Sequence, residues 1–125
     1  MGLDLWIERR YDDGEISPTE EMYWRKAYPV MDWFESHFDG VENCKAYKIG
    51  KSDIEELRLF CSTIIEEESF AEMDALPIVE WTTEAEITEW FDWQMDWVKH
   101  TLSWIDGFLT NPEEDYENLF FIAWW

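Results

Sequence analysis

Positive charge is the property that this sequence has least of. It contains 9 Lys and Arg residues against 30 Asp and Glu residues, which gives a formal net charge of −21. Contact with phosphate groups requires a basic patch, so direct binding to nucleic acid or to an anionic membrane surface is disfavoured. The deficit is greatest in residues 59–125, where Lys99 is the single base among 16 acids. Any electrostatic function is therefore expected in this half of the chain.

Cysteine and long apolar runs are also scarce. The sequence has two cysteines, Cys44 and Cys61. Its start, "MGLDLWIERR", lacks the basic region and apolar run of a signal peptide, so both cysteines are expected to be reduced thiols. Trp6 stands where a myristoylation signal has Ser or Thr, so lipidation is not expected. No stretch approaches ~18 uninterrupted apolar residues, so no membrane span is expected. These absences predict a cytoplasmic protein.

Motifs that carry catalysis or bind metals are missing as well. The sequence contains no Gly-rich phosphate loop, no nucleophile elbow and no local Cys/His signature. His37, Cys44, Cys61 and His100 are possible zinc ligands, but they form no close pair such as C-x-x-C. The stretches "YDDGE" and "NPEEDYEN" lack the ligand spacing of a calcium loop. We therefore expect no enzymatic activity, no cofactor and no metal.

What the sequence does contain is enough apolar material for one core. Hydrophobic residues make up 46% of its 125 residues and aromatic residues 18%, which predicts a single acidic domain over residues 1–125. Leu3, Leu5 and Ile7 alternate with polar or amphipathic residues, as in a half-buried strand. The apolar C-terminal run "ENLFFIAWW" would aggregate if it were free. We expect it to form a buried strand that pairs with the N-terminal one.

Three helices are predicted between these strands. Ser17, Pro18 and Glu20 form a capping box that predicts a helix to about residue 38, kinked at Pro29. Ser52 caps a second helix over residues 52–70, and a third follows residue 83 and stops before residue 111. Short extended pieces are expected at 46–49 and 78–81. The predicted fold class is α+β, with three main helices packed on a small antiparallel sheet that joins the N- and C-terminal strands. The apolar face of the second helix is Ile54, Leu57, Cys61, Ile64 and Ile65.

The third helix, within "EITEWFDWQMDWVKHTLSWIDGFL", is dense in both tryptophan and carboxylate. At about 100° per residue, its predicted core face consists of Phe91, Met95, Val98, Leu102, Ile105 and Leu109. Trp90, Trp97 and Trp104 lie on a flank of that face, and Trp93 lies further round, near Glu89, Asp96 and His100. The flank has two interpretations: a second buried side of a central helix, or a partly exposed aromatic strip within acids that suits a protein interface.

The main basic spot is Arg25 and Lys26, within "MYWRKAY". One interpretation is recognition of a ligand or partner. The other is that Arg25 pairs with a carboxylate on a neighbouring helix, and we favour it because an acidic protein needs internal counter-charges.

Several blocks follow one another in a recognisable order: "MGLDLWI", "YWRKAYPVMDWF", "DGVENC", "SDIEELRLFC" and "FFIAWW". In them the chain resembles a family of small bacteriophage and prophage proteins, which open with Met-Gly-Leu-Asp, carry a Tyr-Trp-Arg-Lys-Ala block and end in an aromatic C-terminus. It departs from that pattern at Asp32, where the family often has histidine, and at "VEWTTEAE", which replaces a glycine-phenylalanine stretch. The resemblance carries over no functional residues. It implies a phage context, in which small acidic proteins often inhibit host machinery.

Charge and resemblance together predict a phage-encoded acidic inhibitor in the host cytoplasm, as a monomer or homodimer. Its carboxylates would mimic the nucleic-acid backbone and block a basic nucleic-acid-binding protein or nuclease complex of host defence, as an anti-CRISPR does. The predicted partner-binding residues are Glu84, Glu86, Glu89, Asp92, Trp93 and Asp96, with Glu66, Glu67 and Glu68 as a second patch.

Two other classes stay open. One is a non-enzymatic structural or regulatory interaction module, whose acidity only gives solubility and whose aromatic residues form a dimer contact. The other is an enzyme or small-ligand binder that uses the tryptophans as a stacking surface.

Overall fold

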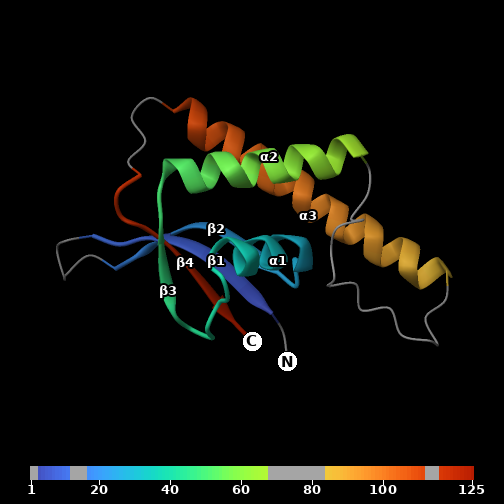
Figure 1. The fold of residues 1–125 in the computed structure, drawn as a ribbon, viewed down its shortest axis with the longest axis horizontal. Helices are drawn as coiled ribbons and strands as arrows, with labels where there is room; N and C mark the ends of the chain where they lie inside the picture. Colours follow the sequence, from blue (N-terminus) through green and yellow to red (C-terminus); the bar gives the residue numbers. More distant parts are fainter. Residues whose placement is uncertain (1–2, 12–16, 68–83, 112–115) are drawn as a thin grey trace.

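The computed structural model describes residues 3–11, 17–67, 84–111 and 116–125. It has three helices and a four-stranded antiparallel sheet (Figure 1). The predicted α+β class is therefore confirmed. Among the residues described, no helix is both long and apolar enough to cross a membrane. The elements in chain order are β1 (Asp4–Arg9), β2 (Thr19–Arg25), α1 (Tyr28–His37), β3 (Ala46–Ile49), α2 (Lys51–Glu67), α3 (Glu84–Thr110) and β4 (Leu119–Trp124).

The two terminal strands lie side by side at the centre of the sheet, as predicted (Figure 1). The strand order is β2-β1-β4-β3, and Leu5 pairs with Ala123 while Ile7 pairs with Phe121. These four side chains are fully buried in the core. Since the core residues of all three helices cluster with this face of the sheet, the molecule has two layers, helices on sheet.

The prediction of one helix over residues 17–38 was wrong in its first half. Thr19–Arg25 forms β2 and pairs with β1 along an edge of the sheet. Met22 and Trp24 are buried while Tyr23 and Arg25 are exposed, so this segment follows the two-residue period of a strand. Burial of Trp24 in the core outweighed the local capping signals at Ser17. Tertiary packing therefore decided the structure of this segment against its local preference for a helix.

Pro29 lies in the first turn of α1 and does not kink a longer helix. The chain turns at Lys26, whose φ is 53° and whose N–H donates to the Leu3 carbonyl at 2.7 Å. The helix then starts at Tyr28 and holds Pro29 in its first turn, where the missing N–H costs nothing.

The other predicted elements are found with small changes. The extended piece at 46–49 is β3, which pairs with β4. The helix α2 begins at Lys51, and its start is capped by Asp53, whose carboxylate accepts the Gly50 N–H at 2.7 Å, and not by Ser52. Its predicted apolar face is buried except for Ile65, which is half-buried. The possible strand at 78–81 lies outside the residues that the structure describes.

The helix α3 has the predicted extent but is rotated about its axis by roughly 45°, at 100° per residue. Phe91, Leu102 and Leu109, expected in the core, are only half-buried, whereas Gln94 and Thr101 are fully buried. Its buried residues in the described part are Gln94, Met95, Val98, Thr101, Ile105 and Phe108.

Two buried polar side chains of α3 determine this rotation, because each is satisfied by β2 and the turn after it. The Gln94 amide donates to the Lys26 carbonyl at 2.8 Å and accepts the Tyr28 N–H at 3.1 Å. The Thr101 hydroxyl accepts the Trp24 indole N–H at 2.6 Å and donates to the Trp97 carbonyl at 2.7 Å. A buried polar group with its partners in place is stable in a core.

Candidate functional site

Four of the predicted site residues form one exposed face of α3. Glu89, Asp92, Trp93 and Asp96 are all exposed, and Trp93 keeps 40% of its surface accessible. At about 100° per residue, they occupy the side of the helix that points away from the core. We call these four residues the acidic strip. The exposure of these four side chains is compatible with the prediction that they bind a partner.

The remaining predicted residues are only partly described. Glu66 and Glu67 are exposed at the end of α2. Their neighbour Ile65 lines a hollow together with Asp92, so the end of α2 lies beside the strip. Glu68 and the side chains of Glu84 and Glu86 lie outside the residues that the structure describes.

Of the tryptophans of α3, three agree with a second buried side of the helix and one agrees with an exposed aromatic strip. Trp90, Trp97 and Trp104 are half-buried and pack against the core, which agrees with a second buried side. Trp24 meets Trp104 edge-on, with ring centroids 6.4 Å apart. Trp93 is exposed and belongs to the acidic strip. One tryptophan of the four is therefore accessible enough to act as an anchor.

A shallow hollow of about 380 Å³ opens beside Trp93 and is lined by Trp93, Asp96, Trp97 and His100. These residues are spaced i, i+3, i+4 and i+7, so they follow one stripe of the helix. The rings of Trp97 and His100 meet at 75°, with centroids 6.0 Å apart. The indole nitrogen of Trp97 is buried and has no hydrogen-bond partner among the described residues.

A second hollow, of about 450 Å³, continues from the first toward the edge of the sheet. His100 lines both hollows. In the second it is joined by Ser103 and Trp104 from α3, and by Glu20, Glu21 and Tyr23 from β2. Glu21 pairs with Arg9 at 3.1 Å. No lysine or arginine lines either hollow, so carboxylates set the charge along the boundary between α3 and β2.

Sequence reasoning missed the contribution of β2 because it placed residues 19–25 in a helix. The alternation in "MYWR", apolar at Met22 and Trp24, was the signal that could have revealed it. The Tyr23 hydroxyl donates to the Asp4 carboxylate. This hydrogen bond, with burial and the charge of Asp4, raises the pKa of Tyr23, while Arg25 acts in the opposite direction.

Arg25 does not pair with a neighbouring helix, contrary to the interpretation that we favoured. It is exposed on β2, where it lies opposite Asp4 of β1. Among the residues described, no ion pair joins it to a carboxylate of a helix.

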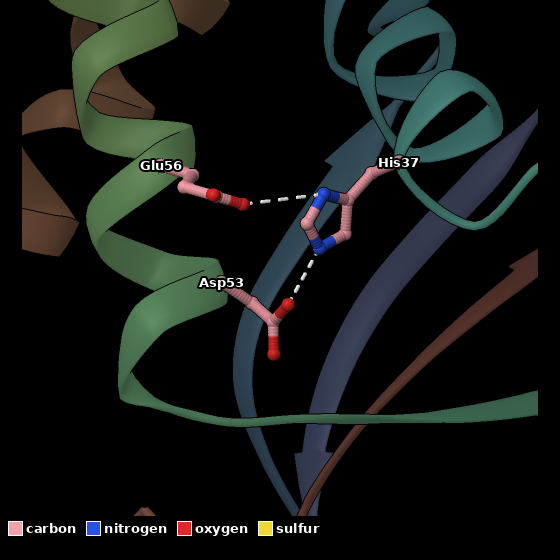
Figure 2. Close-up of side chains that lie close together, drawn as sticks. All are labelled: His37, Asp53 and Glu56. Atoms are coloured by element: carbon pink, nitrogen blue, oxygen red, sulfur yellow. Dashed lines mark hydrogen bonds and ion pairs between the residues drawn. The ribbon is translucent and has the colours of Figure 1, made fainter.

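A cluster at the junction of α1 and α2 joins His37 to two carboxylates (Figure 2). His37 Nε2 lies 2.5 Å from Asp53 Oδ1, and Nδ1 lies 3.4 Å from Glu56 Oε2. Trp33 stacks on the imidazole, with ring centroids 4.5 Å apart. The histidine is in the last turn of α1 and Asp53 is in the first turn of α2, positions that suit the dipoles of both helices.

This cluster has the residue types of a metal site, and one ligand atom from each residue lies within 4.8 Å of the others. Exposed acidic groups often gather in this way without an ion. The two carboxylates lie against different nitrogens of the ring (Figure 2). The imidazole of α1 therefore joins two carboxylates of α2, and we call these three residues the clamp between α1 and α2.

The zinc ligands considered from sequence are not brought together either. Cys44 is exposed and Cys61 is buried in the core of α2. Burial raises the pKa of the Cys61 thiol to about 12, so it is protonated at neutral pH in this structure. His37 belongs to the clamp, and His100 lies on the hollow beside Trp97.

No family model, curated protein or solved structure matches the chain. The relationship to phage proteins is thus a prediction from the sequence blocks alone.

Proposed function

We propose that this protein is a non-enzymatic inhibitor that covers the basic, nucleic-acid-binding surface of another protein. The partner would be a nucleic-acid-binding protein or nuclease complex of host defence, in the phage context that the sequence blocks imply. The observation that supports this proposal best is the acidic strip of α3, where three carboxylates surround an exposed tryptophan on one helix face.

The spacing of the strip suits backbone mimicry. Steps of three or four residues along α3 separate successive carboxylates by about 4.5–6 Å along the helix axis. Each strand of duplex DNA carries a charge about every 3.4 Å of its axis. The linear charge density of the strip is therefore within a factor of about two of that of a nucleic-acid strand. A groove shaped for phosphates can be filled by such a helix.

Charge and tryptophan have separate tasks in this proposal. The net charge of −21 attracts a basic partner over distance and raises the association rate. Trp93 is 40% exposed, and burying that remainder stabilises a complex by on the order of 2 kcal/mol. Trp93 should consequently slow dissociation, and the carboxylates should speed association.

The test is competition with nucleic acid. The tagged protein is immobilised, and basic proteins are captured from bacterial lysate at low salt. Duplex DNA is then added in increasing amounts. The proposal predicts that DNA elutes the captured partner at low and at physiological salt, because both ligands occupy one surface. A partner that holds this protein and DNA together would contradict it.

The rival function, an interaction module that dimerises through aromatic residues, is favoured by one observation. The face of the sheet opposite the helices carries an exposed aromatic side chain at Trp124, which is 54% exposed and follows buried Ala123 in β4. Concentration-dependent dimerisation that is abolished by Trp124→Ala would support that alternative.

A further inference from the structure

The hollow beside Trp93 has two aromatic walls that differ in burial. Trp97 is half-buried and packs against the core, so it forms the inner wall. Trp93 is 40% exposed and forms the outer wall. His100 closes one end, with its ring edge-on to Trp97. The hollow thus has one wall packed on the core and one wall exposed.

The charge in this hollow comes from Asp96. Its side chain is exposed, and it has no hydrogen-bond or ion-pair partner among the residues that the structure describes. The nearest lysine along the helix, Lys99, lines a different hollow with Asp92 and Phe91. An unpaired carboxylate that shares a hollow with two indole rings favours a cation and disfavours an anion or a neutral apolar group.

Among cationic side chains, arginine fits this arrangement best. Its guanidinium is planar, stacks on aromatic faces and is weakly hydrated, and it donates two parallel hydrogen bonds to a carboxylate. The lysine ammonium is compact and strongly hydrated, so it gains less from flat indole walls. We propose that a subsite for an arginine side chain of the basic partner is formed by Trp93, Asp96, Trp97 and His100. This proposal rests on the proposed function, because the arginine belongs to the partner.

The second hollow extends this subsite toward β2. Because His100 lines both hollows, the arginine would enter beside α3 while the rest of its segment follows the boundary with β2. Glu20 is exposed there, and it offers a carboxylate to a further basic residue. The occupant is therefore an arginine-bearing basic segment of the partner.

The subsite is tested with short peptides on the intact protein. The probe is acetyl-Gly-Arg-Gly-amide, and the controls are the same peptide with lysine or with citrulline, which keeps the arginine shape without its charge. The indole N–H signals are followed by NMR. We expect the arginine peptide to shift the Trp93 and Trp97 signals saturably, and to leave those of buried Trp24 and exposed Trp124 unmoved. The lysine peptide should bind at least about five-fold more weakly, and citrulline should not saturate.

Three variants with unchanged melting transitions complete the test. Asp96→Asn and Trp93→Ala should each weaken the arginine peptide by about five-fold or more. Glu55→Gln removes an exposed carboxylate of α2 and should leave affinity unchanged. Equal binding of the three peptides, or full affinity in Asp96→Asn, would overturn the subsite. These peptide results test the subsite alone. The proposed function is tested separately, by whether DNA elutes the captured partner from the wild-type protein.

Discussion

The contact between Trp24 and Thr101 gives the sharpest test of the fold, because it joins the edge strand β2 to the rotated α3. Both residues have no exposed surface, and the indole N–H donates to the threonine hydroxyl at 2.6 Å. Thr101→Val keeps the shape of the side chain and removes the acceptor. The Trp24 N–H is then left buried without a partner.

The expected cost follows from two opposing terms. A buried donor without a partner costs about 1–3 kcal/mol. The valine methyl that replaces the hydroxyl recovers about 0.5–1 kcal/mol through apolar burial. The net loss is about 1–2 kcal/mol, which lowers the melting temperature by roughly 3–8 °C for a domain of this size. Urea unfolding followed by tryptophan fluorescence measures the loss.

The chain offers a matched control in Thr63. Its hydroxyl also donates to the carbonyl four residues earlier, at 2.9 Å from Leu59 O, but Thr63 is exposed and receives no indole. Thr63→Val should change stability by less than about 0.5 kcal/mol. If Thr101→Val were as mild as Thr63→Val, then β2 would not place Trp24 against α3 and the orientation of that helix would be wrong.

Three further predictions concern packing and thiol chemistry. Ile105→Ala, at a fully buried position, should lower the free energy of unfolding by about 2–5 kcal/mol. Leu102→Ala should lower it by less than half as much, because Leu102 is half-buried. Equal losses in urea unfolding would refute the rotation of α3. Deletion of 119–125 removes β4 from between β1 and β3 and should abolish the folding transition in circular dichroism; a truncated protein that still melts cooperatively would disprove the central role of β4. At pH 8 a thiol reagent should modify exposed Cys44 at once and Cys61 only after unfolding, because Cys61 is buried and its pKa of about 12 keeps it protonated. Rapid reaction of two thiols in the native state would contradict the burial of Cys61.

Elements whose apolar residues recur with a clear period in the sequence could be predicted. Leu3, Leu5 and Ile7 alternate, and the C-terminal run is too apolar to be exposed, so the pairing of the termini followed from burial alone. The extent of α3 was predictable because Asn111-Pro112 stops a helix. Exposure of Glu89, Asp92 and Asp96 followed from that helical periodicity, even with an error in rotation, whereas the sequence left open whether Trp93 is buried or exposed.

Features that depend on distant partners could not be predicted. The strand β2 exists because β1 pairs with it, and that pairing outweighed the capping residues near Ser17. Gln94 and Thr101 were not among the predicted core residues of α3, because polar side chains usually lie at the surface. Their partners on Lys26, Tyr28 and Trp24 are contributed by a segment more than 60 residues away. For the same reason the hollow formed with Glu20 and Tyr23 has no signature in the sequence.

In the proposed function, the position of the carboxylates, and not only their number, creates the binding surface. The most direct measurement is the association rate of the captured partner with two triple-amide variants of equal net charge. One carries Glu89→Gln, Asp92→Asn and Asp96→Asn in the acidic strip. The other carries Glu35→Gln, Glu42→Gln and Glu55→Gln at exposed positions on other parts of the fold.

We expect the strip variant to associate about tenfold more slowly than wild type at low salt, and this difference to shrink as salt is raised. The second variant should associate at close to the wild-type rate. Equal association rates for the two variants would show that only the total charge matters, and would contradict the claim.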